Sequence, residues 1–285
     1  MAEIIDGKLV ASNIRSKIKE DITAFISKSG ITPGLAVVIV GDDPASLVYV
    51  KNKKKACEQV GIKSYEIALP ADVSESEIID NLNRLNNDPS VHGILVQLPL
   101  PKHINEEKVI NTIDPRKDVD AFNPVNVGGI FIGNYTFLPC TPAGVIDLID
   151  YYGIEISGKK CVVLGRSNIV GKPMAHLLLE RNGTVTVCHS RTQNLEDEIR
   201  SADILVVAIG RAEFVKGHML KQGAVVIDVG INRTGDGRLL GDVEFSSASK
   251  VASYITPVPG GVGPMTITTL LKNTLRAAKL SHGEK

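Results

Sequence analysis

The stretch "CVVLGRSNIVGKPMAHLLLERNG", residues 161–183, decides the fold that we expect for this chain. Four apolar residues lead into a glycine, a polar turn follows, and a helix-like segment completes a strand–turn–helix unit. A dinucleotide turn of the form G-x-G-x-x-G needs glycine at 165, 167 and 170, but only Gly165 matches and Gly171 comes one position late. The context still indicates a nucleotide site, because a glycine lets the backbone turn and a helix N-terminus receives a pyrophosphate.

The strand that follows this helix indicates which dinucleotide is bound. An NAD enzyme usually places an acidic residue about 20 residues beyond the first glycine, where it holds the ribose hydroxyls. Here His189, Ser190 and Arg191 stand at that strand end, and Arg166 lies in the turn itself. Cations and a hydroxyl suit a 2′-phosphate, so we expect NADP. The alternative is that both arginines are solvated loop residues, and a lone His189 is more typical of a structural role.

Alternating apolar segments on both sides of this unit predict two α/β domains with a cleft between them, the second Rossmann-like. The expected strands are 35–41, 64–70, 91–101, 160–165, 184–190, 202–210, 223–230 and 252–260. Helices are expected at 7–30, 44–60, 74–88 and 141–152, and this alternation favours parallel strands. We expect a catalytic domain over 1–140, an NADP-binding domain over 141–263, and a C-terminal helix, 264–285, that packs back on the first. Residues 111–142 read as a long irregular linker.

Composition excludes several classes of function. Lys plus Arg and Asp plus Glu both number 32 in 285 residues, which gives no reason to expect a nucleic-acid partner. Tryptophan is absent, and the histidines and four cysteines show no metal-ligand spacing, so we expect no metal and buried thiols in a reducing compartment. No signal peptide or membrane-spanning run is visible, so we expect a soluble, cytoplasmic protein without membrane contact.

A second stretch, "SLVYVKNKKKACEQVG" (46–61), raises a question about its lysines. Asp43, Pro44 and Gly61 predict the two ends of a helix. At about 100° per residue, Lys53 lies at the centre of the apolar stripe, whereas the other three lysines lie on the flank or far face. Its stem could pack while the ammonium reaches water, or it could be a partly desolvated amine with a lowered pKa, with Tyr49 one turn away.

The carboxyl ends of two expected strands bring a polar side chain toward this lysine. Gln97 ends the third strand, and the lysine helix begins at the end of the first. Ligands of open α/β sheets bind beyond the carboxyl ends of strands, so we expect both to border one crevice. The pair Tyr49 and Lys53 also fits the Tyr-x-x-x-Lys of short-chain dehydrogenases, but it precedes Gly165 here, so that reading fails.

Taken together, the motifs resemble the bacterial type of bifunctional methylenetetrahydrofolate dehydrogenase/methenyltetrahydrofolate cyclohydrolase. The matching segments run in order through the chain: "ASLVYVKNK", "VHGILVQLPLP", "KDVDAFNPVNVG", "PCTPAGV", "VLGRSNIVGKP", "CHSRT", "VIDVGIN", "GDV" and "ITPVPGGVGPMT". One position departs from the family pattern, since Ala121 stands where glycine usually follows "KDVD".

The resemblance implies an activity and a set of site residues. It implies oxidation of 5,10-methylenetetrahydrofolate with NADP⁺ and hydrolysis of the methenyl product to 10-formyltetrahydrofolate, in a homodimer. Two alternatives are a dehydrogenase without cyclohydrolase activity and a non-catalytic nucleotide-binding regulator. The implied catalytic residues are Lys53, Tyr49, Gln97 and Asp120. The implied folate contacts are Ser46, Tyr49, Asp120, Pro259, Gly260 and Gly261. The implied NADP contacts are Gly165, Arg166, Ser167, Ser190, Arg191 and Ile231.

Overall fold

The computed structural model describes residues 1–284, apart from the side chain of Ala45, and it divides into two compact units. The lysine unit joins Asn13–Cys140 to the chain from Ile267 on, and the glycine-turn unit joins Met1–Ser12 to Thr141–Thr266. The division falls inside two long helices, α1 (Gly7–Ser29) and α10 (Val262–Ser281). No described helix is both long enough and apolar enough to cross a membrane.

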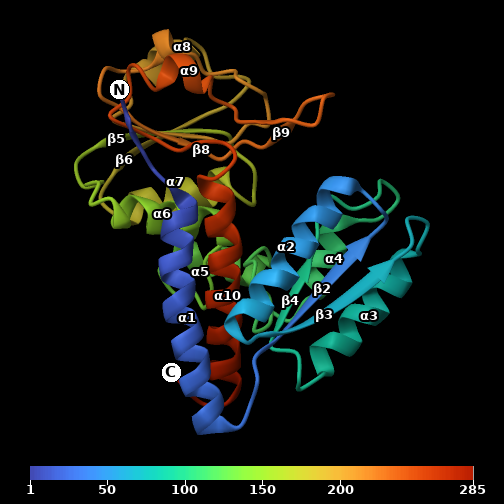
Figure 1. Ribbon diagram of the computed structural model, residues 1–285. Helices are drawn as coiled ribbons and strands as arrows, with labels where there is room; N and C mark the ends of the chain where they lie inside the picture. The colour runs from blue at the N-terminus through green and yellow to red at the C-terminus, as the bar shows by residue number, and fades with distance from the viewer. Residues whose placement is uncertain (285) are drawn as a thin grey trace. The chain divides into compact units, whose positions relative to one another are not determined.

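The lysine unit is built on a three-stranded parallel sheet with the order β3-β2-β4 (Figure 1). Its elements are β2 (Gly34–Val40), α2 (Pro44–Val60), β3 (Lys63–Leu69), α3 (Glu75–Asn87), β4 (Gly93–Val96), α4 (Glu106–Thr112) and α5 (Pro124–Phe131). Side chains of β2 alternate between two apolar cores. Leu35, Val37 and Ile39 pack with α1, α2 and α10, whereas Ala36, Val38 and Val40 pack with α3 and α4. Every residue of β2 is buried because helices cover both faces of the sheet.

Helix α2 has the ends that the sequence predicts. The Asp43 carboxylate accepts a hydrogen bond from the Ser46 N–H, and Pro44 opens the first turn. Gly61 adopts a left-handed conformation, with φ 90°, and its N–H donates to the Cys57 carbonyl. These contacts satisfy backbone groups that an α-helix leaves without partners, so the local sequence fixes where α2 starts and stops.

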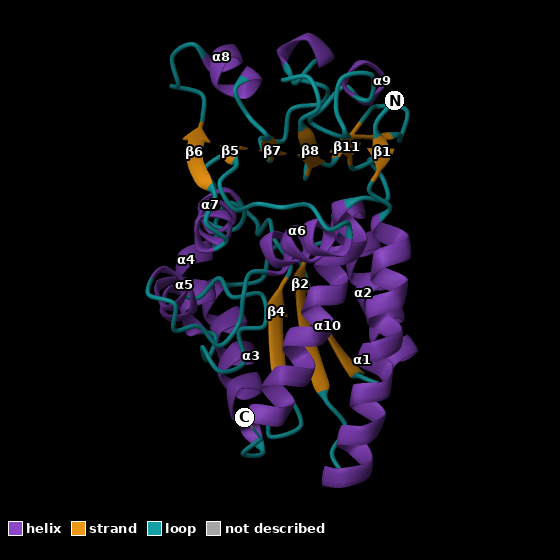
Figure 2. Ribbon diagram, turned by 90° about the vertical axis from the view of Figure 1, so that its left-hand side faces the viewer, coloured by secondary structure: helices purple, strands orange, loops and turns teal. Residues whose placement is uncertain are grey.

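The glycine-turn unit contains a six-stranded parallel sheet with the order β6-β5-β7-β8-β11-β1 (Figure 2). Its strands are β1 (Glu3–Ile4), β5 (Lys160–Leu164), β6 (Thr184–Cys188), β7 (Ile204–Val207), β8 (Val225–Asp228) and β11 (Tyr254–Ile255), with the small hairpin β9 (Asn232–Arg233) and β10 (Leu239–Leu240). Its helices are α6 (Cys140–Tyr151), α7 (Gly171–Glu180), α8 (Leu195–Arg200), the 3₁₀ turn η1 (Gly217–Met219) and α9 (Phe245–Ala248). Because β6 lies on one side of β5 and β7 on the other, the chain order reverses at β5. In such sheets a dinucleotide binds beyond the carboxyl ends of the strands at that reversal.

Two boundaries differ from those expected. The first twelve residues belong with the glycine-turn unit, because β1 pairs in parallel with β11 at the edge of its sheet. Helix α10 starts at Val262, so Pro264 lies inside its first turn, where proline is tolerated because those N–H groups lack partners. Lys285, the last residue of the expected C-terminal helix, lies outside the described residues.

The segment 111–142, expected as irregular, contains a helix. Helix α5 starts at Pro124, and the side chain of Asn123 accepts a hydrogen bond from the Val125 N–H. An Asn-Pro pair is a helix-start signal. The glycines that follow it gave the segment the composition of an irregular loop, so the short helix was not expected. Helix α6 begins at Cys140, one residue earlier than expected, and β4 is shorter than the expected strand 91–101.

Candidate active site

Lys53 points into the lysine unit and is held there by Gln97. The lysine side chain is 7% exposed, and its Nζ donates a hydrogen bond to Gln97 Oε1 at 2.9 Å. The Gln97 Nε2 donates to the Leu98 carbonyl at 2.8 Å, which fixes the amide so that its oxygen faces the lysine. Burial lowers the pKa of the Lys53 amine from its ordinary value, because desolvation disfavours the charged form. Of the two readings of an inward lysine, the structure shows the desolvated amine.

Asp120 supplies the negative charge near this amine. Its charge opposes the desolvation effect and raises the pKa of Lys53 in part, as do smaller contributions from Cys140 and Cys57. Both thiols are buried, and desolvation is the main cause that raises the pKa of Cys57 to about 12 and that of Cys140 well above its ordinary value. Neither cysteine is therefore a nucleophile near neutral pH.

Asp118, which sequence analysis did not single out, fixes the turn that carries Asp120. Its Oδ2 accepts from the Asn123 N–H and from Asn126 Nδ2, both at 2.8 Å. Asp118 also bridges to Ile94, which places the segment beside β4. Burial raises the pKa of Asp118 to about 6. The only sequence signal was the density of Asp and Asn in "KDVDAFNPVN", which cannot say which carboxylate turns inward.

Ala121 adopts the backbone conformation for which the family pattern has glycine. Its φ is 58°, in the left-handed region, and its side chain is buried. A left-handed conformation costs an L-residue about 1–2 kcal/mol relative to glycine. The loop geometry is thus the one that a glycine would adopt, and the departure at Ala121 adds strain at one residue.

Two other expected site residues lie on α2 beside Lys53. Ser46 is buried, and Tyr49, one turn before the lysine, is partly buried, which raises the pKa of its phenol. In the described part of the chain, Tyr49 and Lys53 do not form the hydrogen bond that their spacing would allow. The lysine bonds to Gln97 instead. Pro259, Gly260 and Gly261 belong to the glycine-turn unit, where Gly260 has a φ of 112°.

The turn after β5 needs glycine at two positions. Gly165 has a φ of 130°, and a Cβ there would lie 2.2 Å from the carbonyl oxygen of Ala208. A Cβ on Gly171 would lie 2.3 Å from the carbonyl oxygen of Gly165, so the glycine that comes late in the motif lets α7 approach the strand. The Ser167 hydroxyl accepts hydrogen bonds from the N–H groups of Val170 and Gly171, at 3.2 and 3.3 Å.

The groups expected to bind the 2′-phosphate lie at the carboxyl ends of two neighbouring strands, Arg166 after β5 and Ser190 and Arg191 after β6. Arg166, Ser190 and Arg191 are all exposed, and within residues 1–284 no ion pair engages either guanidinium. The Arg191 N–H donates to His189 Nδ1 at 3.1 Å, so His189 holds the shape of this turn. No acidic side chain stands at the end of β6, so the residues present fit a phosphate-bearing dinucleotide. Ile231 is 44% exposed in the loop after β8.

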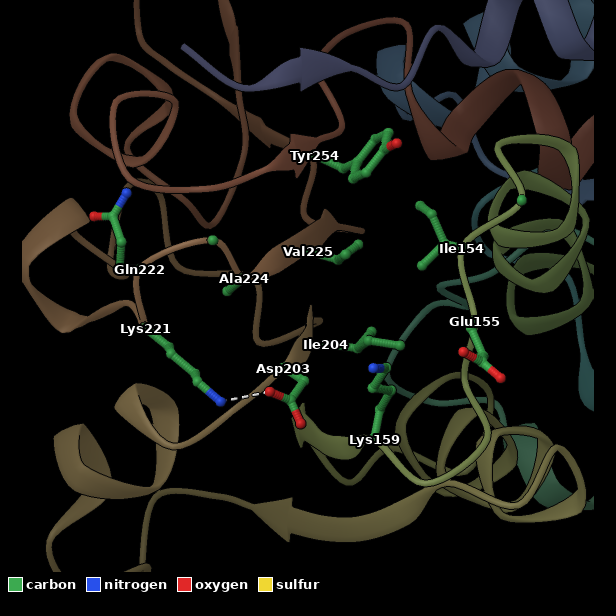
Figure 3. A pocket seen from close by; sticks show the side chains of 12 residues that line it. Ile154, Glu155, Lys159, Asp203, Ile204, Lys221, Gln222, Ala224, Val225 and Tyr254 are labelled. Carbon is green, nitrogen blue, oxygen red and sulfur yellow. Dashed lines mark hydrogen bonds and ion pairs between the residues drawn. The ribbon is translucent and has the colours of Figure 1, made fainter.

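The glycine-turn unit also has a hollow of about 350 Å³ at the amino ends of its parallel strands (Figure 3). It is lined by residues at the amino ends of β5, β7, β8 and β11, among them Lys159, Ile204, Val225 and Tyr254. Lys221 bonds to Asp203 at its margin. Because dinucleotides bind beyond the carboxyl ends of parallel strands, this hollow is not the expected cofactor site.

Comparisons with known proteins match two domains of one family, in chain order. The sequence matches the tetrahydrofolate dehydrogenase/cyclohydrolase catalytic domain over residues 5–120 and the NAD(P)-binding domain of the same family over residues 139–282. The bifunctional protein FolD of Acetivibrio thermocellus is 63% identical over 279 residues, which cover 98% of each chain.

Solved structures are similar along nearly the whole chain. The bifunctional FolD methylenetetrahydrofolate dehydrogenase/cyclohydrolase of Campylobacter jejuni has a TM-score of 0.95 at 49% identity, covering 98% of this chain and 99% of that one. The Trypanosoma brucei methylenetetrahydrofolate dehydrogenase-cyclohydrolase, complexed with NADP cofactor and inhibitor, has a TM-score of 0.96 at 42% identity and 99% coverage of each. With both family domains matched in order and relatives this similar, the chain belongs to the tetrahydrofolate dehydrogenase/cyclohydrolase family.

Proposed function

We propose that Lys53 transfers the protons in an enzyme that oxidises 5,10-methylenetetrahydrofolate with NADP⁺ and hydrolyses the methenyl product to 10-formyltetrahydrofolate. One observation carries this proposal. The Lys53 amine is buried, its pKa is lowered by desolvation, and it bonds to a neutral amide oxygen at 2.9 Å. A neutral partner leaves the amine free to lose its proton, whereas a carboxylate at this distance would hold it.

The oxidation needs positioning more than proton transfer. A hydride leaves the methylene carbon between two nitrogens, and the product is an amidinium cation, so no proton has to leave in this step. Bound NADP⁺ supplies the hydride acceptor. The chain contributes by holding the folate ring in one orientation. Such positioning supplies a large share of the lowering of the activation barrier.

The hydrolysis needs a base and then an acid. Water must lose a proton as its oxygen bonds to the methenyl carbon, and one ring nitrogen must gain a proton as its bond to that carbon breaks. Neutral Lys53 takes the first proton and, as an ammonium, gives it to the leaving nitrogen. The remaining hydroxyl proton leaves to solvent as the formyl C=O forms, so hydrolysis of the cation releases one proton overall. An amine whose pKa lies nearer to neutrality performs both transfers better than an ordinary lysine.

The neighbours of Lys53 have supporting roles. Gln97 orients the amine without adding charge, and Asp120 accepts hydrogen bonds from the amidine-like edge of the pterin, a geometry that a carboxylate matches. Tyr49 stacks on the pterin, Ser46 contacts the folate or holds α2, and the segment Pro259–Gly261 contacts the folate.

The glycine-turn unit holds NADP. The turn at Gly165, Arg166 and Ser167 receives the pyrophosphate at the start of α7, and Ser190 and Arg191 bind the 2′-phosphate. The loop at Ile231 contacts the nicotinamide end. The two guanidiniums are exposed and form no ion pair within residues 1–284, and no acidic residue stands at the end of β6; both observations support NADP over NAD.

We further propose a cytoplasmic homodimer. The edge strand β6 offers unpaired backbone groups, and Val187 on it is 38% exposed, which favours pairing with a second copy. Four free, buried thiols fit a reducing compartment. Light scattering at micromolar concentration should give twice the chain mass; a single-chain mass would exclude the dimer.

The function is tested by supplying methylenetetrahydrofolate and NADP⁺ and measuring NADPH and then formyl product. The variant Lys53→Met, which keeps the length and removes the amine, should lose hydrolysis of the methenyl compound and keep NADP⁺ binding. Lys54→Met is a matched control, because Lys54 is an exposed residue of the same helix. Full hydrolysis by Lys53→Met would exclude the assigned role.

A further inference from the structure

Two carboxylates are buried in the glycine-turn unit outside the groups described so far. Asp228 ends β8 and is 3% exposed, and Asp242 follows β10 and is fully buried. Within residues 1–284 neither forms an ion pair, so neutral donors alone compensate their charges. Burial raises the pKa of Asp228 to about 6, and the charge of Asp242 adds to this rise.

Asp242 closes the loop that follows β7. Its Oδ2 accepts from the N–H groups of Ile209 and Gly210, at 2.7 and 2.9 Å, and its Oδ1 accepts from the Arg211 N–H at 2.8 Å. Successive N–H groups in a turn with a left-handed residue, here Gly210 with φ 64°, form a concavity that binds anions. In this chain the concavity already holds an anion, the carboxylate of Asp242.

The same two carboxylates hold both flanks of Ile231. Asn232 Nδ2 donates to Asp242 Oδ1 at 2.9 Å, and the Gly230 N–H donates to Asp228 Oδ1 at 2.9 Å. Asp228 also accepts from the N–H groups of Asp242 and Val243, at 3.0 and 2.8 Å, so it fixes the backbone that carries the other carboxylate.

These loops lie where the dinucleotide is expected. Ala208, directly before the loop held by Asp242, is the residue whose carbonyl oxygen leaves no room for a side chain on Gly165. Both loops follow the carboxyl ends of parallel strands, and β7 is the strand next to the reversal at β5. A shift of the loop after β7 would therefore disturb the glycine turn, and a shift of the loop after β8 would move Ile231.

We propose that Asp242, held in place by Asp228, is a positioning residue for NADP⁺ binding, because it fixes the loops after β7 and β8 in the conformation that the dinucleotide requires. This inference rests on the proposed NADP-dependent function. It also implies that the two turns bind different anions. The N–H groups of residues 209–211 bind the Asp242 carboxylate, and the turn between Gly165 and Gly171 binds the cofactor phosphates.

The test uses the two activities of one protein. Asp242→Asn keeps the shape but turns an accepting oxygen into an NH₂ group that faces an N–H. Losing one hydrogen bond to a charged group corresponds to a factor of about ten or more, so KM for NADP⁺ should rise at least about tenfold. Hydrolysis of the methenyl compound uses no cofactor and should stay near its wild-type rate, with a far smaller change in dehydrogenase kcat than in KM. Asp236→Asn, on the exposed turn of the same hairpin, is the matched control and should change neither activity.

A second, milder variant keeps the test decisive if Asp242→Asn fails to fold. Asn232→Ala removes one donor to Asp242, and a smaller rise in KM for NADP⁺ with unchanged hydrolysis is expected. Equal loss of both activities in both variants, or an unchanged KM for NADP⁺ in the folded proteins, would overturn the inference. A wild-type protein that never reduces NADP⁺ would instead overturn the proposed function, so the two failures are distinguishable.

Discussion

The substitution Gln97→Glu tests whether hydrolysis depends on an amine that loses its proton readily. Glutamate has nearly the shape of glutamine, so one carboxylate oxygen can occupy the place of Oε1, 2.9 Å from Lys53 Nζ. The variant therefore replaces a neutral acceptor by a charged one, and it also loses the Nε2 donor that bonds to the Leu98 carbonyl.

The size of the effect follows from that distance. Two unit charges 2.9 Å apart attract by about 6 kcal/mol at an effective dielectric constant of about 20, which corresponds to a rise of about four in the lysine pKa. Desolvation of the new carboxylate offsets part of this attraction, so we expect a rise of about two or more. Either figure shifts the Lys53 amine toward its protonated form.

The assay is the pH profile of methenyl hydrolysis, corrected for the uncatalysed rate, beside NADP⁺ reduction on the same preparations. The rate should increase as pH rises through the Lys53 pKa, since the neutral amine is the base. In Gln97→Glu this increase should move to higher pH, while NADP⁺ reduction persists because hydride transfer releases no proton. Gln97→Asn, which shortens the contact group without adding charge, separates loss of contact from gain of charge. A profile that coincides with wild type would refute the reasoning.

Three further outcomes are expected. Asp120→Asn removes the charge that raises the Lys53 pKa, so the pH profile of hydrolysis should move to lower pH, whatever the change in rate; a move to higher pH would contradict this. Arg191→Ala should weaken NADP⁺ more than NAD⁺, by about tenfold if one charged hydrogen bond to the 2′-phosphate is lost, and titration with both dinucleotides checks it. Gly171→Ala places a Cβ against the carbonyl oxygen of Gly165, so KM for NADP⁺ should rise while hydrolysis continues. An unchanged KM would show that α7 can retreat without cost.

Local sequence determined those elements whose signals lie within a few residues. The ends of α2 follow from Asp43, Pro44 and Gly61, because each satisfies or frees neighbouring backbone groups. The strand–turn–helix at Gly165 follows from one glycine and an apolar run. The inward direction of Lys53 follows from helical periodicity alone, which the structure confirms.

Tertiary structure decided what depends on residues far apart in the chain. Only the fold brings Gln97 to Lys53, joins β1 to β11, and seats Asp242 in the loop after β7. The state of the Lys53 amine belongs to this second group, because desolvation and the Asp120 charge are set by everything packed around the side chain. Sequence periodicity gives the direction of a side chain, but the dielectric environment and the partners that fix its chemistry come from contacts between distant segments.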